Sequence, residues 1–478
     1  MRTLKASTSW LCLACCLSVT STAETVKRPN IVLILADDLG WSDLGCYGAD
    51  LHETPHLDRL ARSGLRFTNA YSASVCSPTR ASLMTGKHYA GLHMTIWYEA
   101  SQDPPLDRRL IPPRTVNNLP HDETTIAKRL QAVGYRTALI GKWHLGDAQH
   151  YPETHGFDIN IGGTLWGAPA SYFFPYRGAG RFGGEFRYVP HLELGRPDEY
   201  LTDRLTDEAI KVIDAAGEQP FFLYLAHHAV HTPIEAKADL TTHYQQKLAP
   251  GLRHQNPKYA AMTDSLDQSV GRVLERLEHN KIADRTIVIF LSDNGGHIGK
   301  FDDVTCTNNA PLRSGKGSLY EGGVRVPLLV RAPGVTTNGV VCNEPIMAAD
   351  LPVTIAQLAG LTRTQDSHAW DGQNLEPLLH DPNAKLKRTA LYFHYPHYYP
   401  TTTPASAIRA DNWKLIEYLE DGRTELYDLA KDIGEKDNLA SSQPERATQL
   451  KEMLHAWRQA AKVQMPEPNP SFESKPGR

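Results

Sequence analysis

The chain has 478 residues, of which 41% are hydrophobic and 22% are charged, so it contains enough apolar material for a large globular core. Its formal net charge of −4 lacks the basic excess that is typical of nucleic-acid-binding proteins. We therefore predict no nucleic-acid partner, and an anionic ligand would need a local cluster of cations.

The N-terminus has the pattern of an export signal. A basic start precedes an apolar run over residues 10–19, and small residues up to Ala23 suit cleavage. We predict a signal peptide over residues 1–23 and a periplasmic or secreted mature protein. Lipidation of Cys15 or Cys16 is the alternative, but the residues before them resemble a lipoprotein signal poorly. No later apolar run is long enough to cross a bilayer, so we predict no transmembrane segment.

Four cysteines follow the predicted signal peptide: Cys46, Cys76, Cys306 and Cys342. They are too few for the disulfide framework of an exported chain of this length. No pair has the Cys-x-x-Cys spacing of a zinc site. A bridge between Cys306 and Cys342 is compatible with the sequence, but we do not expect it.

Four short apolar runs predict buried strands of a mostly parallel sheet, because they are continuous rather than alternating. Helical patterns separate them, for example over residues 123–134 and 261–277, which indicates an α/β sandwich. Ligands of such sheets bind beyond the carboxyl ends of the strands, so the polar residues found there are expected to converge on one site. In chain order the runs are residues 31–36 before Asp37 and Asp38, residues 135–141 before Lys142 and His144, residues 221–226 before His227, His228 and His231, and residues 286–292 before Asp293 and Asn294.

Two of these strand ends offer only hard oxygen ligands. Asp37 and Asp38 follow the first run, and Asp293 and Asn294 follow the last. Such ligands favour calcium or magnesium over zinc or copper. Helix capping would explain either pair alone, but it is a weak explanation for both pairs together.

The stretch SVCSPTR, residues 74–80, places a cysteine directly before a predicted helix. Pro78 suits the first helical position, where its missing N–H costs nothing. A thiol at a helix N-terminus has a lowered pKa and is reactive, which is a liability in an oxidising compartment. We therefore expect Cys76 to be buried or to be chemically modified in the working protein.

This stretch resembles the Cys-x-Pro-x-Arg core of the formylglycine-dependent sulfatases, which belong to the alkaline phosphatase superfamily. Residues 81–86, ASLMTG, extend the match, and GYRTALIGKWH at residues 134–144 resembles the second signature of that family. Further matches are ADDLGWSDLGCYG, HHAVHTP, SDNGG and GKGSLYEGGVRVP, so the resemblance covers nearly all of the mature chain. It implies an alkaline-phosphatase-like sandwich with a large mixed, mostly parallel central sheet flanked by helices.

The resemblance also implies a modified residue and a metal. A formylglycine-generating or sulfatase-maturating enzyme would oxidise Cys76 to formylglycine (3-oxoalanine) during export. One Ca²⁺ per chain would be bound by residue 76 together with the four oxygen-bearing residues named above. The hydrated aldehyde, a gem-diol, would attack sulfur and form a covalent sulfoenzyme. Its second hydroxyl would then allow sulfate to leave, which a serine could not achieve.

Five further residues match the catalytic groups of the family. Arg80 would hold the hydrate, and Lys142 and Lys316 would contact the sulfate. His231 matches the general acid that protonates the departing alkoxide. His144 matches the base that releases sulfate from the enzyme and restores the aldehyde.

The substrate implied by export and by the loop composition is a sulfated carbohydrate. Residues 97–120 and 162–197 lack periodicity, and long irregular segments of compact proteins are often binding loops. Their aromatic and arginine side chains suit stacking on sugars and pairing with acid groups. We expect four residues to bind substrate: His228, His297, His394 and Arg409. A structural role is the alternative for strand-end histidines such as His228.

The chain changes character near residue 386. Residues 388–428 alternate as antiparallel strands, with a turn at Asp421-Gly422, and residues 445–463 predict an amphipathic helix. We therefore predict a catalytic domain over residues 24–385 and a smaller C-terminal antiparallel sheet subdomain over residues 386–478. The tail after Met465 is expected to be poorly ordered.

Two other functions are compatible with the same motifs. One is a phosphonate or phosphodiester hydrolase of the same superfamily. The other is a non-catalytic protein that binds sulfated glycans without turnover. The intact set of Lys142, His144, His231 and Lys316 argues against the second, and we predict a sulfuric ester hydrolase.

Overall fold

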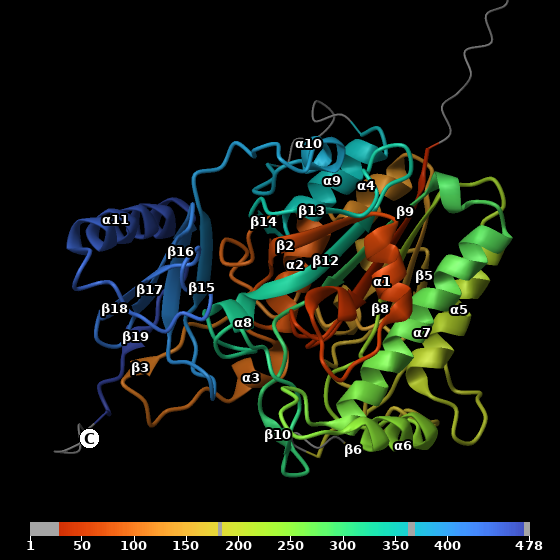
Figure 1. Ribbon diagram of the computed structural model, residues 1–478, viewed down its shortest axis with the longest axis horizontal. Helices are drawn as coiled ribbons and strands as arrows, with labels where there is room; N and C mark the ends of the chain where they lie inside the picture. The colour runs from red at the N-terminus through yellow and green to blue at the C-terminus, as the bar shows by residue number, and fades with distance from the viewer. Residues whose placement is uncertain (1–27, 180–183, 362–368, 473–478) are drawn as a thin grey trace, which may run out of the picture.

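The computed structural model describes residues 28–179, 184–361 and 369–472, so the predicted signal peptide lies outside the described residues. In these ranges, nine strands form a central mixed sheet, helices cover both of its faces, and a smaller sheet lies beside it at the C-terminal end (Figure 1). No helix in these ranges is both long and apolar enough to span a membrane. The predicted α/β architecture with a second, antiparallel sheet is confirmed.

The central sheet places the four predicted strands next to one another. Its strands, in spatial order, are β13 (Val340–Cys342), β2 (Leu65–Tyr71), β12 (Arg325–Arg331), β9 (Thr286–Ser292), β1 (Asn30–Ala36), β8 (Phe221–Ala226), β4 (Arg136–Gly141) and β5 (Ile159–Ile161), with β14 (Ile346–Met347) also paired to β2. The run β9–β1–β8–β4 is entirely parallel, whereas β12 is antiparallel to both of its neighbours. The carboxyl ends of the four predicted strands therefore meet at one edge, called here the carboxyl edge.

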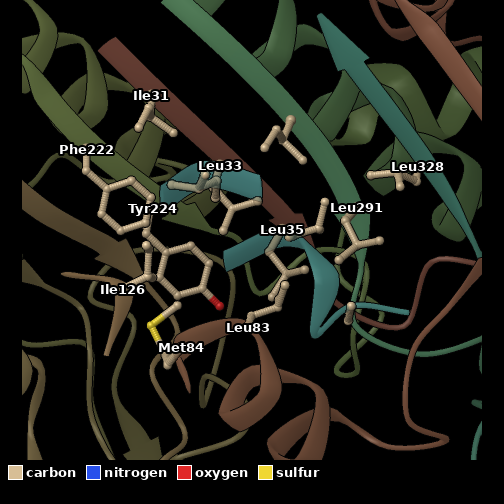
Figure 2. Packing of buried hydrophobic residues seen from close by; sticks show 14 of the residues in the cluster. Ile31, Leu33, Leu35, Leu83, Met84, Ile126, Phe222, Tyr224, Leu291 and Leu328 are labelled. Carbon is tan, nitrogen blue, oxygen red and sulfur yellow. The ribbon is translucent and has the colours of Figure 1, made fainter. Parts of the chain in front are cut away.

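Alternate residues of β1 face two separate hydrophobic clusters, which explains why its sequence is apolar throughout. On one face, Leu83 and Met84 of α2 and Ile126 of α4 pack against the sheet (Figure 2). The helices of this face are α2 (Cys76–Thr85), α4 (Ile126–Ala132), α9 (Asp350–Leu358) and α10 (Glu376–His380). The other face is covered by α1 (Pro55–Arg62), α5 (Leu201–Ala215) and α7 (Pro257–His279), with α6 (Ala238–Lys247) packed on α7.

Helix α2 begins two residues earlier than the sequence pattern suggests. Val75 is its N-cap and Cys76 its first helical residue, so Pro78 is the third residue and not the first. The change costs nothing, because the first backbone N–H groups of a helix lack intrahelical acceptors and proline is tolerated there. All ten residues of α2 are buried, so this helix lies inside the molecule rather than on its surface.

The C-terminal sheet consists of β15 (Leu391–Tyr395), β16 (Ala405–Ala410), β17 (Trp413–Tyr418) and β18 (Thr424–Asp428), which are antiparallel in that order. Helix α11 (Pro444–Ala460) packs on one face, and the other face packs against the catalytic region (Figure 1). The predicted turn at Asp421-Gly422 joins β17 to β18. The expectation of a poorly ordered tail is wrong for its first residues, because β19 (Glu467–Pro468) pairs with β3 (Leu110–Ile111).

The remaining elements are short. They are α3 (Tyr98–Gln102), α8 (Glu321–Val324), the hairpins β6 (Gly178–Ala179) with β7 (Phe186–Arg187) and β10 (Lys300–Phe301) with β11 (Val304–Thr305), and the 3₁₀ turns Gly45–Tyr47, Ala148–His150, Pro152–His155 and Ala283–Arg285. All four cysteines of the described ranges are free. Cys306 and Cys342 belong to the clusters on opposite faces of the central sheet.

Candidate active site

The residues that follow the four parallel strands gather at the carboxyl edge with two residues of α2 and one of the loop before α8. The cluster has three carboxylates and three cations, all buried: Asp37, Asp38, Asp293, Arg80, Lys142 and Lys316. Buried charges require partners, and here the opposite charges are equal in number. The sequence-predicted catalytic and metal-binding residues are thus brought together by the fold.

Each cation of this cluster contacts a particular carboxylate. Lys142 Nζ lies 2.5 Å from Asp37 Oδ2, and Lys316 Nζ lies 2.8 Å from Asp38 Oδ1. Arg80 donates through Nε and Nη2 to Asp293 Oδ2, at 3.0 and 2.8 Å. Because a planar guanidinium binds a carboxylate with fixed geometry, Arg80 locks α2 to the end of β9.

Two oxygens of the cluster have no donor within the described parts of the chain. They are Asp37 Oδ1 and Asn294 Oδ1, and both belong to fully buried side chains. A buried acceptor without a partner is costly, and such atoms in native proteins usually mark an ion or water. The amide of Asn294 also donates to Asp38 Oδ1 at 2.8 Å, so its own oxygen is turned away from that carboxylate. This oxygen set fits a hard divalent cation.

The two aspartates after β1 have opposite electrostatic environments. Burial and the nearby Asp293 carboxylate raise the pKa of Asp37 well above its usual value. At Asp38 burial acts in the same direction, but Lys316 and His231 outweigh it and hold the pKa far below the usual range. A bound dication would favour the ionised form of both carboxylates, because its charge is the largest in such a site.

Cys76 lies beside the base predicted by the resemblance. Its Sγ is 3.4 Å from His144 Nδ1, and the residue is only 2% exposed. Burial, assisted by the charge of Lys142, lowers the pKa of His144 to about 4, so the imidazole is neutral near pH 7. A neutral imidazole next to residue 76 is in the form required to accept a proton from it.

A cavity of about 310 Å³ opens onto this cluster. Five of its lining residues belong to the charged cluster or contact it, and they are called here the sulfate end after the ligand that the family resemblance implies: Asp38, Cys76, His144, His231 and Lys316. The other lining residues, called here the outer wall, come from segments far apart in the sequence: Trp97, Glu99, Ala100, Gly167, Ala168, Arg187, Thr232, His297 and Tyr399. Both irregular segments singled out in the sequence, residues 97–120 and 162–197, therefore contribute to the wall.

Histidine 231 presents one nitrogen to the sulfate end. Its Nδ1 lies 2.7 Å from the carbonyl oxygen of Thr232, which fixes Nδ1 as the donor and leaves Nε2 facing Asp38 Oδ2 at 3.6 Å. Burial and the charge of Lys316 lower the pKa of His231 well below its usual value. An anionic group bound nearby would draw a proton to Nε2, and that proton would then be readily donated.

Not every predicted substrate-binding residue reaches the cavity. His297 lines it, and His228 is buried near Arg80 and Lys142 with neither ring nitrogen hydrogen-bonded to the described residues. His394 instead lies within the C-terminal sheet, where Ser406 Oγ and the Gln464 carbonyl oxygen occupy both of its nitrogens at 2.8 Å.

Arg409 lies at the joint between the two sheets. Its guanidinium contacts the hydroxyl of Tyr71 and lies 3.3 Å from Asn69 Oδ1. It borders a separate groove and not the cavity at the carboxyl edge. The structure thus gives His394 and Arg409 structural contacts in place of the predicted contacts with substrate.

A second group of residues also has the composition of a metal site, but its hydrogen bonds indicate a structural role. Asp43, His52 and His254 place ligand atoms within 4.8 Å of one another. The oxygens of Asp43 already accept from Thr307 Oγ1 at 2.6 Å, and from Tyr259 Oη and Gly40 N at 2.7 Å. Since Tyr259 also donates to the Asp38 carbonyl, we interpret this group as a support for the loop that follows β1.

A buried oxygen cluster, an α/β sandwich and a histidine-lined cavity at the carboxyl edge together define a hydrolase of the alkaline-phosphatase-like fold. Comparison with known families refines this class. The sulfatase family model matches residues 29–361, and the model of the C-terminal region of N-sulphoglucosamine sulphohydrolase matches residues 315–462. The chain belongs to the sulfatase family and is a sulfuric ester hydrolase.

Individual relatives agree with this assignment. A sulfatase of Formosa agariphila is 34% identical over 497 residues, which cover 90% of this chain and 89% of the relative. Human N-acetylgalactosamine-6-sulfatase is 36% identical over 369 residues, which cover 74% of this chain and 66% of the relative. A crystal structure of Ps i-CgsB in complex with k-i-k-neocarrahexaose superposes with a TM-score of 0.75 at 31% identity, over 94% of this chain and 95% of that one.

Proposed function

We propose that this chain is an exported, calcium- and formylglycine-dependent sulfatase that hydrolyses sulfate esters of carbohydrates. The observation that carries the metal is the pair of unpartnered oxygens, Asp37 Oδ1 and Asn294 Oδ1, inside a buried cluster of carboxylates. Export is supported by the N-terminal sequence pattern, with a periplasmic or secreted destination. Modification is supported by the position of Cys76, which lies at the sulfate end.

In this proposal Asp37, Asp38, Asp293 and Asn294 hold the calcium ion with residue 76. When bound, the ion and the formylglycine hydrate would supply a polarised hydroxyl nucleophile and charge stabilisation for a sulfate oxygen. Arg80 keeps Asp293 in place through its two hydrogen bonds.

The remaining residues of the charged cluster and of the sulfate end stabilise charge or transfer protons. Lys142 and Lys316 would stabilise the charge on the oxygens of the sulfuryl group. His231 would donate a proton from Nε2 to the departing alkoxide oxygen, and His144 would accept a proton at Nδ1 from residue 76.

A carbohydrate is the substrate class that the cavity wall supports best. Trp97 and Tyr399 lie edge to face with ring centroids 5.8 Å apart, and they offer aromatic surface beside the sulfate end. Glu99 and Arg187 add polar groups that suit hydroxyls. The neocarrahexaose complex of the similar structure and the N-acetylgalactosamine-6-sulfatase activity named for the human relative support the same class.

The function is tested by comparing substrates on one purified, matured preparation. We expect release of sulfate from an aryl sulfate and from some members of a panel of sulfated mono- and oligosaccharides. Mass spectrometry should show formylglycine at position 76 in the active protein. Faster hydrolysis of an aryl phosphodiester than of the sulfate would favour the phosphodiesterase alternative. Binding of sulfated sugars without sulfate release by fully modified protein would favour a non-catalytic binder.

Replacement of His231 gives a prediction that depends on the leaving group. H231Q is expected to lower kcat on a sugar sulfate by about 10²–10³-fold, which is the usual contribution of general acid catalysis. The loss on nitrophenyl sulfate should be less than about tenfold, because a stable phenolate needs little protonation. Equal losses on the two substrates would contradict the assignment of His231 as the acid.

A further inference from the structure

Glu99 is a partly buried carboxylate that no sequence motif indicates. It lies in α3, on the outer wall of the cavity, and its side chain is 20% exposed. Its Oε2 is 3.2 Å from His144 Nε2, on the side of the ring opposite to Cys76, whose Sγ faces Nδ1 at 3.4 Å. Residue 76, His144 and Glu99 therefore form one continuous line of polar contacts.

We propose that Glu99 is a positioning residue for His144: it holds the imidazole in the orientation and tautomer in which Nδ1 can accept a proton from residue 76. The inference rests on the proposed function, because it gives Glu99 its effect through the base of that reaction. The arrangement has the logic of a nucleophile, a base and an orienting carboxylate.

The tautomer follows from the donor and acceptor requirements of the ring. A neutral imidazole carries one N–H and one lone pair. An ionised carboxylate only accepts, so the contact with Glu99 places the N–H on Nε2 and the lone pair on Nδ1. Burial would raise the pKa of Glu99, but His144 and Arg187 outweigh it and lower the value to about 2, so the carboxylate is ionised.

The proton that Nδ1 accepts gives the ring a positive charge among other cations. Lys142 and Arg80 already disfavour the protonated form of His144, whereas Glu99 favours it. The carboxylate therefore offsets this repulsion when the proton moves from the residue-76 hydroxyl to Nδ1. Only this proton changes place in the step, and Glu99 stays ionised throughout.

Glu99 is itself held in position. Its Oε1 accepts from the backbone N–H of Gly167 and from Arg187 Nη2, both at 3.4 Å. Arg187 is anchored in turn by Glu185 and by the carbonyl oxygen of Ala168. These contacts come from residues 162–197, so this segment fixes the orienting carboxylate as well as the cavity wall.

The ring of His144 is also confined by Gly167. A Cβ atom at position 167 would lie 2.3 Å from His144 Cε1, closer than such atoms ever approach. The absence of a side chain at position 167 thus leaves room for the ring with Nε2 directed at Glu99. G167A is a second way to disturb the same orientation without removing any charge.

The alternative role for Glu99 is a direct hydrogen bond to a sugar hydroxyl, and kinetics separate the two. We expect E99A to lower kcat by about 10²-fold on both an aryl sulfate and a sugar sulfate, with KM changed less than about threefold. E99Q should lie between wild type and E99A, because an amide oxygen accepts the N–H but carries no charge. A rise in KM confined to the sugar sulfate, with kcat unchanged, would overturn the proposal.

A double-mutant cycle tests whether Glu99 acts through the ring. In an H144A background, E99A should cost less than about twofold in kcat, since there is no ring to orient. A cost as large as in the wild type would overturn the proposal. G167A should lower kcat on both substrates as E99A does. Thermal unfolding of each variant shows whether a loss is one of folding.

A measurement without turnover completes the test. In ¹⁵N-histidine-labelled protein that retains the Cys76 thiol, the His144 resonances are assigned by their absence in H144A. We expect the wild type to show the Nε2–H tautomer and E99A to show a mixture. An unchanged tautomer in E99A would overturn the proposal. If the wild type releases no sulfate from any substrate, the proposed function fails, while this spectrum still reports on Glu99.

Discussion

Cys76→Ala is expected to reduce kcat by at least about 10⁴-fold, the scale of loss seen when a nucleophile is removed from an otherwise intact site. Alanine lacks the thiol on which a maturating enzyme would act, so its Cβ is not converted to an aldehyde and no hydroxyl is formed at the sulfate end. Sulfate release measured on matched preparations of the wild type and the variant checks this result. Activity within tenfold of the wild type would contradict a role for residue 76 in the reaction.

The folded state should survive this change. The thiol borders the cavity and contacts His144, which is neutral, so the substitution enlarges the cavity without leaving a buried charge unpaired. C76S provides a matched control with one hydroxyl in place of two. We expect a single turnover followed by accumulation of a sulfated serine, detected as a mass increase on the peptide that contains position 76. Continuous turnover by C76S would refute the need for the second hydroxyl.

Asp37→Asn should remove bound calcium and lower kcat by about 10³-fold or more, because a metal ion contributes several kcal/mol of charge stabilisation at such sites. The amide keeps the shape of Asp37 but loses the charge that faces Lys142 and the cation. Metal analysis of dialysed protein, together with sulfate release at saturating calcium, measures both effects. Full calcium content in the variant would refute the ligand role of Asp37.

The group of Asp43, His52 and His254 supplies the control for metal location. H52Q alters that group without touching the cluster at the carboxyl edge, since His52 contacts the backbone oxygen and the carboxylate of Asp43. We expect H52Q to retain calcium. Loss of calcium in H52Q but not in D37N would show that the ion binds at Asp43, His52 and His254 instead.

Most of the candidate site could be predicted because the ends of buried strands can be recognised from the sequence pattern. Continuous apolar runs indicate buried parallel strands, and the polar residues directly after them lie at the carboxyl edge of the sheet. Asp37, Lys142, His231 and Asp293 follow four strands that prove to be neighbours in the sheet. Lys316 follows no strand and was indicated only by the family motif.

The outer wall of the cavity could not be predicted residue by residue. Glu99, Arg187 and Tyr399 lie in irregular segments, where no periodicity states which side chains turn inward. The same ambiguity applies to His394, which we expected to bind substrate but which lies in β15 with both nitrogens bonded. Which face of the C-terminal sheet meets the catalytic region depends on tertiary packing that a single sequence does not encode locally.

The burial of α2 limits the time during which Cys76 is accessible to another enzyme. Cys76 sits on a helix with no exposed residue, and its neighbourhood is completed by Tyr399 and by Thr401, which donates to the Lys316 carbonyl oxygen. These two residues are synthesised long after the cysteine. Under the proposed function, a modifying enzyme must therefore reach Cys76 before residues 386–478 dock. A molecule that folds before Cys76 is modified is expected to remain inactive, even though its sequence is unchanged.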